Sequence, residues 1–589
     1  MKKTLALILV AIMLIGAFAG CSQKKDKEVS YGVYRDYVNT AVTTLNVVVK
    51  NDALKVARPL QTVLYKNYIN EDGTGYEMLP QLAADVPQQM DEEGKVWRIP
   101  IRQDYYWADY GPTAGKNAQM NADTVMYTFK MCIDPDLLNV NASMLVNSSY
   151  MRIVNAYEYQ QQYMSGTEVA FEDVGIKKID DFTIEITTEQ PTNELVVMDF
   201  MGHSSCLFMV YEPLYEACMG DDRSWNEYGT SFDTWASSGE FILTEWIPDG
   251  TVKMIKNPNY VKADDIHVSG IEFHVVPDSN TAIELFEAGQ LDRVDLLYQQ
   301  WEQYGEDPRV YLYYNDSVTY LFINNGNPKY NNVLGSTTFR EAIHYGLDRN
   351  DFAKQLGGFP NVRLYRRAAI AEVATGKSML DVPVDWADDP ATVYDKAKAE
   401  QLITKAKEEL KINDSTMTFE VYYNESGTHT RASVEIFQKQ MDALAGIDMT
   451  IRAVPSNIAY KLRKWDASNP TAYDFNLGSV LPSDGPIDTM TSWTPSNSAP
   501  GFYWDNMPEH KERFQSLFDQ ALVAVQENDE AKEVELCLEM EKMLVKELYI
   551  RIPIYELPSK MLFSERVQLP AGGYVNGYGF GEYYVTIIE

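Results

Sequence analysis

Cysteine, histidine and basic residues are all scarce in this sequence. The five cysteines include no CxxC pair, and the six histidines show no HExxH motif or other close metal spacing. We therefore expect neither a bound metal nor a cofactor. Lysines and arginines number 51 against 85 aspartates and glutamates, a formal net charge of −34 at pH 7. Phosphates would be repelled by this charge, which argues against a nucleic-acid partner.

Long hydrophobic runs are also missing after residue 20. Lys2 and Lys3 precede an apolar run over residues 5–19, which is shorter than the ~20 residues that cross a hydrocarbon core. Such a run at the start of a chain predicts a signal sequence over residues 1–20. The polar, aperiodic residues 21–30 predict a flexible tether.

The end of this run resembles a bacterial lipobox, with the sequence Phe18-Ala19-Gly20-Cys21. In a lipobox the cysteine is diacylated and becomes the mature N-terminus, so the resemblance implies lipidation of Cys21. Two or more acyl chains anchor a protein stably, since each buried CH₂ contributes ~0.8 kcal/mol. We expect the body of the protein to lie outside the cytoplasmic membrane, anchored to its outer face. An ordinary secreted protein with a chance cysteine is the alternative.

The remaining composition is that of a large globular protein. Hydrophobic residues make up 45% and charged residues 23% of the 589 residues, and single cores stop growing near ~250–300 residues, so we expect two or more lobes. Cys132, Cys206, Cys218 and Cys537 are interpreted as buried free thiols. A disulfide between Cys206 and Cys218 is the alternative in an oxidising location.

The stretch from residue 79 to residue 129 combines a strand, a loop and a capped helix. Trp97, Ile99 and Ile101 alternate with polar or proline positions, as in a half-buried strand. Pro100 cannot donate to a ladder, which favours a place at the edge of a sheet. Asn121 then stands at a helix N-cap position, before apolar residues at helical spacing.

Apolar periodicity predicts further elements. Strand, helix and strand patterns over residues 419–423, 434–444 and 449–453 predict a βαβ unit with parallel strands and a right-handed crossover. The second lobe is therefore expected to be α/β. Helical spacing also predicts helices over four segments: residues 60–68, 391–410, 514–525 and 530–547.

The order of these motifs resembles the extracellular solute-binding proteins of family 5, the oligopeptide- and dipeptide-binding lipoproteins of peptide ABC transporters. The resemblance rests on five segments: residues 97–102, Trp107-Ala108-Asp109, residues 121–129, residues 320–325 and Gly346-Leu347-Asp348-Arg349. It implies a two-lobed α/β fold like that of periplasmic binding proteins, of type II and the large peptide-binder class. An extra subdomain and a ligand cleft between the lobes belong to that fold.

The resemblance also implies domain boundaries. After the signal sequence and tether, lobe I would comprise residues 31–58, 175–275 and 549–589, the extra subdomain residues 59–174, and lobe II residues 276–548. The strand at residues 271–276 would be the hinge, and the strand at residues 552–555 would return to lobe I.

The family's peptide-pairing strand and ligand loop correspond to residues 473–486. In the peptide binders the strand pairs with the peptide backbone, and an aspartate of the loop binds the free ammonium group. Here the loop contains Ser479, Val480 and Leu481, and Pro482 stands where that aspartate is expected. Asp484 could supply the carboxylate; its alternative role is that of a turn residue before Gly485.

Weaker candidates match family positions near the cleft. Arg463 could bind the ligand's carboxylate, with a solvated surface charge as the alternative. Trp107, Tyr127 and Tyr320 could contact the ligand, with core packing as the alternative.

The function implied is a lipid-anchored substrate-binding protein that captures oligopeptides, or a related extended solute, for the permease subunits of an ABC importer. We expect a monomer. A peptide-sensing lipoprotein and a binder of an oligosaccharide or metal chelate are alternatives with the same fold. A hydrolase is disfavoured, because residues 202–206 begin like a nucleophile elbow but place Cys206 where the second glycine should be.

Overall fold

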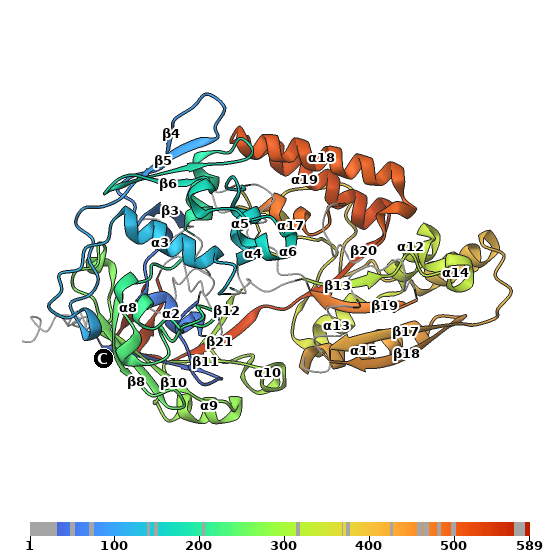
Figure 1. The fold of residues 1–589 in the computed structure, drawn as a ribbon. Helices are drawn as coiled ribbons and strands as arrows, with labels where there is room; N and C mark the ends of the chain where they lie inside the picture. The colour runs from blue at the N-terminus through green and yellow to red at the C-terminus, as the bar shows by residue number, and fades with distance from the viewer. Residues whose placement is uncertain are drawn as a thin grey trace, which may run out of the picture.

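A computed structural model gives the arrangement of most of the chain (Figure 1). It describes residues 32–47, 53–69, 76–137, 139, 142–146, 151–202, 207–313, 318–367, 369–372, 377–424, 428–455, 462, 471–479, 485–495, 502–570 and 584–588. No helix within these ranges has the length and apolarity needed to span a bilayer.

The first half of the molecule contains a four-stranded mixed sheet. Its strands lie in the order β1 (Val33–Val38), β10 (Gly270–Val275), β9 (Thr251–Lys256) and β8 (Phe241–Trp246). β1 and β10 are parallel and the other pairs antiparallel. Alternate residues such as Val252, Met254 and Phe273 are buried in the core of this half.

A second four-stranded sheet carries the predicted strand at residue 97. Its order is β4 (Gln88–Gln89), β5 (Val96–Pro100), β7 (Thr183–Thr187) and β6 (Ile176–Asp180). Trp97 and Ile99 are buried, as predicted. The predicted edge position is wrong, because β5 lies between β4 and β7. Pro100 is tolerated there because the two-residue β4 pairs only with Trp97 and Arg98.

The predicted helix after Asn121 is confirmed. α3 (Ala122–Ile133) begins with a capping box: the Asn121 side chain accepts a hydrogen bond from the Thr124 N–H at 3.2 Å, and the Thr124 hydroxyl accepts from the Asn121 N–H at 3.3 Å. The remaining helices of this region are α2 (Leu54–Ala57), α4 (Ala142–Val146), α5 (Ala156–Gln160), α6 (Gln162–Ser165), α7 (Glu194–Met201) and α8 (Glu212–Ala217).

The helix predicted over residues 60–68 is wrong. A short 3₁₀ turn, Arg58–Leu60, leads instead into β2 (Tyr65–Ile69), which forms an antiparallel hairpin with β3 (Tyr76–Pro80). Apolar residues occur on both faces of this segment because both faces are buried. The alternation typical of a half-buried strand is therefore missing, and the apolar residues also fit helical spacing.

A three-stranded sheet also belongs to the first half. Its order is β11 (Arg293–Asp295), β21 (Ser559–Phe563) and β12 (Val310–Tyr313), and α9 (Ser279–Glu287) and α10 (Tyr298–Tyr304) accompany it. The buried Asp292 carboxylate binds the Arg35 guanidinium of β1 at 3.0 Å and the Arg35 N–H at 2.9 Å. The passage to the second lobe was predicted after residue 275, but these contacts keep residues 279–313 with the first half.

The second half is built on a six-stranded sheet. Its order is β14 (Phe359–Pro360), β20 (Arg551–Glu556), β13 (Val318–Ile323), β19 (Phe475–Ser479), β17 (Met417–Asn424) and β18 (Ile447–Val454). β17 and β18 are parallel and are connected through α15 (Thr428–Asp442), which confirms the βαβ unit.

Helices and loops cover both faces of this sheet. Along β13, Leu321 and Ile323 pack in one core cluster, whereas Tyr320 and Phe322 pack in another. The helices of this half are α11 (Lys329–Asn332), α12 (Thr337–Gly346), α13 (Arg349–Leu356), α14 (Lys396–Glu409), α17 (Pro486–Thr491), α18 (Pro508–Gln526) and α19 (Glu530–Lys542). The three helices predicted over residues 391–410, 514–525 and 530–547 are confirmed, and the last ends in a π-helical turn, Met543–Glu547.

A two-stranded ribbon joins the halves. β12 leads to β13 and β20 leads to β21, and the crossing strands are neighbours: Tyr313 pairs with Ser559 on one side and Val318 with Glu556 on the other (Figure 1). The strand at residues 552–555 was predicted to return to lobe I. It lies instead in β20, within the six-stranded sheet, because it pairs with β13 and β14. β21 makes the return.

Candidate functional site

The predicted peptide-pairing strand ends beside the ribbon. β19 runs antiparallel to β13, so its last residue, Ser479, pairs with Thr319, the second residue of β13 after the crossing. Ser479 is exposed. β19 therefore ends, at Ser479, where the two halves meet. Val480, Leu481 and Asp484 themselves lie outside the described residues.

The start of β19 is anchored by a buried carboxylate. Asp474 accepts hydrogen bonds from the Asn327 amide at 2.7 Å, the Lys329 ammonium at 2.6 Å and the Glu420 N–H at 2.9 Å. Only 1% of Asp474 is exposed. These bonds fix β19 to β17 and to the turn after β13, and so they position Ser479.

The start of α17, which follows the predicted ligand loop in the sequence, is anchored as well. α17 begins at Pro486, whose carbonyl accepts a hydrogen bond from the Tyr365 hydroxyl at 3.1 Å. The next N–H, of Ile487, donates to the Glu533 carboxylate of α19 at 3.2 Å. Burial, with smaller contributions from Asp488 and Glu530, raises the pKa of Glu533 to about 7. Nothing in the sequence signals this contact, because residues 487 and 533 meet only through packing.

Trp107 lies in the core of the first half. It is 5% exposed, and its ring centroid lies 5.5 Å from that of Tyr211. The backbone N–H of Trp107 donates to the Ala118 carbonyl at 2.9 Å. Tyr127, on α3, is half-buried, and its hydroxyl donates to Glu216 at 2.6 Å. Burial and the Glu216 carboxylate raise the pKa of this hydroxyl.

Tyr320 lies in the core of the second half. Its hydroxyl donates to the Leu364 carbonyl at 2.6 Å, and its fully buried ring meets Trp493 edge-on at 5.8 Å. The structure thus assigns Trp107 and Tyr320 to the cores of different halves, which favours the packing alternative for both. Contact of Trp107, Tyr127 or Tyr320 with a ligand stays a prediction.

Three further predictions concern residues outside the described ranges: Cys21, Arg463 and Cys206. Cys132 and Cys537 are buried free thiols, as interpreted from the sequence, whereas Cys218 is a free thiol that is only partly buried. Residues 203–206 of the nucleophile-elbow alternative also lie outside these ranges.

A second contact between the halves was missed by the sequence analysis. The side chain of Gln526, the last residue of α18, donates to the Pro191 carbonyl of the first half at 2.9 Å, and the Asn193 amide donates to the Val525 carbonyl. This contact is separate from the ribbon. The halves are therefore joined covalently at the ribbon and by hydrogen bonds at the end of α18.

Comparison with known proteins supports this two-lobed arrangement. The substrate-binding domain of an oligopeptide ABC transporter from Bacillus anthracis str. Ames superimposes with a TM-score of 0.66 at 19% identity, over 95% of this chain and 100% of that chain. The predicted α/β fold of the type II binding-protein class is confirmed.

Sequence comparison gives the family. The oligopeptide-binding protein OppA of Bacillus subtilis (strain 168) is 24% identical over 373 residues, and the match spans 60% of this chain and 60% of the length of OppA. The oligopeptide-binding protein SarA of Streptococcus gordonii is 23% identical over 551 residues, 85% of this chain and 78% of SarA. The model of the bacterial extracellular solute-binding proteins, family 5 (middle part), matches residues 77–502. Because this match covers well over half of the sequence, the chain belongs to the extracellular solute-binding proteins of family 5.

Proposed function

We propose that this protein captures an oligopeptide, or a related extended solute, between its two halves and delivers it to the permease of an ABC importer. The observation that carries the proposal is the position of Ser479, which ends β19 at the ribbon between the halves. The names of OppA and SarA as oligopeptide-binding proteins support the peptide class.

Strand pairing would supply most of the affinity. An extended peptide can add to the exposed end of β19 and to Val480 and Leu481 through backbone hydrogen bonds, which accept any side chain. Closure of the halves about the ribbon would then bury the ligand from both sides. Such a site needs no catalytic group, so no turnover of the ligand is expected.

The ends of the peptide would be bound by charge. Asp484 is proposed to bind the ammonium group and Arg463 the carboxylate, since charge-assisted hydrogen bonds are the stronger ones. Contact of the ligand with Trp107, Tyr127 and Tyr320 remains part of this proposal.

The proposed location is supported by the family and by the lipobox-like sequence that ends at Cys21. Family 5 proteins are extracellular. A lipid on Cys21 would hold this chain, as a monomer, at the outer face of the cytoplasmic membrane. Replacement of Cys21 by Ser should move the protein from the membrane fraction to the medium, and retention in the membrane would contradict lipid anchoring.

Calorimetric titration of the purified protein with a peptide library tests the substrate class. We expect saturable binding of oligopeptides and no binding of oligosaccharides or metal chelates. Binding of an oligosaccharide or metal chelate alone would overturn the peptide proposal.

The role of Asp484 is tested with its isosteric amide. Asp484→Asn should weaken the binding of peptides with a free amino terminus about tenfold, because a charge-assisted hydrogen bond is lost. Binding of N-acetylated peptides should not change. Asp414→Asn, at an exposed site before β17, is the matched control. If the native protein, Asp484→Asn and Asp414→Asn bind peptides with a free amino terminus equally tightly, Asp484 is not part of the site.

A further inference from the structure

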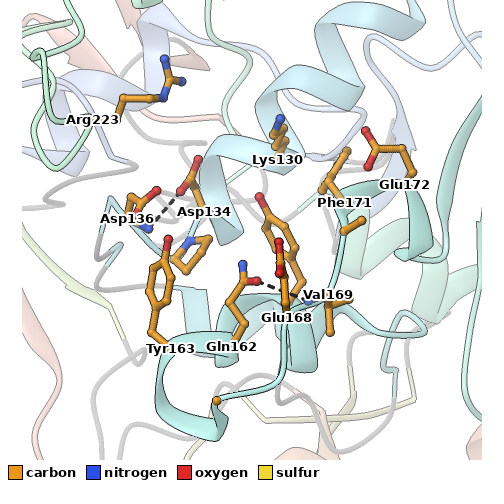
Figure 2. Close-up of a pocket in the computed structure, with 14 residues that line it drawn as sticks. Lys130, Asp134, Asp136, Gln162, Tyr163, Glu168, Val169, Phe171, Glu172 and Arg223 are labelled. Carbon is orange, nitrogen blue, oxygen red and sulfur yellow. Dashed lines mark hydrogen bonds between the residues drawn. The ribbon is translucent and has the colours of Figure 1, made fainter.

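We infer that a cavity in the first half, between the C-terminal end of α3 and helix α6, is a second binding site that takes an organic cation, an alkylammonium or guanidinium group. The cavity has a volume of about 860 Å³ (Figure 2). Ligand pockets typically measure ~300–1,000 Å³. Its lining includes no residue of β19 or α17, so the site is separate from the proposed peptide site.

Carboxylates dominate the wall of the cavity. Four acidic residues line it: Asp134, Asp136, Glu168 and Glu172. None of the four forms an ion pair with a residue in the described part of the chain. Of the two basic residues at the wall, Arg223 already binds the Glu216 carboxylate through two bonds of 2.9 and 3.1 Å. Lys130 lies over the Phe171 ring at 5.6 Å.

Two residues of the wall, Tyr159 and Asp134, are largely buried and have few hydrogen-bond partners among the described residues. Tyr159 is only 7% exposed, and its hydroxyl makes no hydrogen bond to any residue that the structure describes. Asp134 is 9% exposed; one of its carboxylate oxygens accepts from the Asp136 N–H at 3.0 Å. This carboxylate has no ion pair in the described part of the chain, and burial raises the pKa of Asp134. A cationic N–H donor would satisfy both the carboxylate and the phenol oxygen.

The aromatic residues of the wall favour an organic cation over a metal ion. The Tyr159 and Phe171 rings meet at 5.5 Å, and Tyr163 lies on the same side as Asp136 in Figure 2. Such rings attract alkylammonium and guanidinium groups through their faces and cover the attached methylenes. Hard metal ions require several oxygen ligands, and no three potential metal ligands of the described residues are grouped for that purpose.

The test is a calorimetric titration of the full-chain protein with 1,5-diaminopentane at pH 7 and about 150 mM salt, where the Debye length of ~8 Å screens non-specific attraction. We expect saturable binding of the diamine and none of the neutral 1,5-pentanediol. Asp134→Asn should weaken diamine binding about tenfold, and Tyr159→Phe, which preserves the ring contact, about fivefold. Equal thermal midpoints would show that both variants are folded.

Two controls separate this site from others. Asp414→Asn removes one exposed charge far from the cavity and should leave the diamine affinity unchanged. Asp484→Asn should also leave it unchanged. Absence of saturable binding, unchanged affinity in both Asp134→Asn and Tyr159→Phe, or loss of diamine binding in Asp484→Asn would each overturn the inference. Peptide binding without diamine binding would contradict this inference and leave the proposed function standing.

Discussion

At the scale of single residues, Asp474 determines where the peptide-pairing strand lies. Its carboxylate accepts from Asn327, Lys329 and the Glu420 N–H. We predict that Asp474→Ala lowers the free energy of unfolding by about 2–4 kcal/mol, because buried donors lose their acceptor. Urea unfolding measures this loss. Asp448→Ala, at an exposed carboxylate of β18 in the same sheet, should cost less than about 1 kcal/mol. Similar losses in both variants would contradict an anchoring role.

Glu533 links the stability of the protein to pH. Its pKa is raised from the ordinary 4.5 to about 7, so the folded protein binds this proton more tightly than the unfolded chain. The resulting stabilisation is fully present below pH 4.5 and is lost as the pH rises through about 7. The loss amounts to ~3 kcal/mol at most.

We therefore predict that Glu533→Gln, which retains an acceptor for the Ile487 N–H, gains stability relative to the native protein between pH 4.5 and pH 8. Thermal or urea unfolding across this range measures the difference. Burial and Arg349 lower the pKa of His344 to about 4. His344 is present in both proteins, so its contribution cancels in the difference between their stabilities. Glu535→Gln, an exposed residue of the same helix, is the control. A difference that does not change with pH would contradict the prediction.

At the scale of elements, local patterns explain most helices and strands. α3 begins at a capping box that is visible in the sequence. Asn121→Ala should lower the free energy of unfolding by about 1 kcal/mol, whereas Asn121→Asp, another good N-cap, should change it little. Chemical denaturation tests both, and an equal loss in both variants would exclude a capping effect.

Two elements show where local patterns mislead. The segment from residue 60 to residue 68 has apolar residues at helical spacing, but β3 supplies a partner that makes the extended conformation more stable. Pro100 suggested an edge strand, yet β5 lies between β4 and β7; the proline is tolerated because β4 ends before reaching it. Both differences arise from strand partners that are not visible within the segments themselves.

At the scale of the whole molecule, the contact of Gln526 with Pro191 bridges the halves. We predict that Gln526→Ala shifts the protein without ligand toward a more open arrangement, because one hydrogen bond of about 0.5–1.5 kcal/mol is lost between the halves. Distances between spin labels placed in the two halves measure the shift. Gln520→Ala, on the same helix but bonded only within it, should not change them. Equal distance distributions in the two variants would contradict a bridging role.

The sequence by itself determined the family, the two-lobed α/β class, the βαβ unit and the capped helix, because these depend on periodicity and on motifs within short segments. Only the tertiary structure decided that β20 lies in the six-stranded sheet, that a two-stranded ribbon joins the halves, and that Tyr320 is a core residue. It also brought Asp134 and Tyr159 to one cavity. These features depend on which distant segments pair and pack, and the free energy of such contacts is shared between residues far apart in the chain.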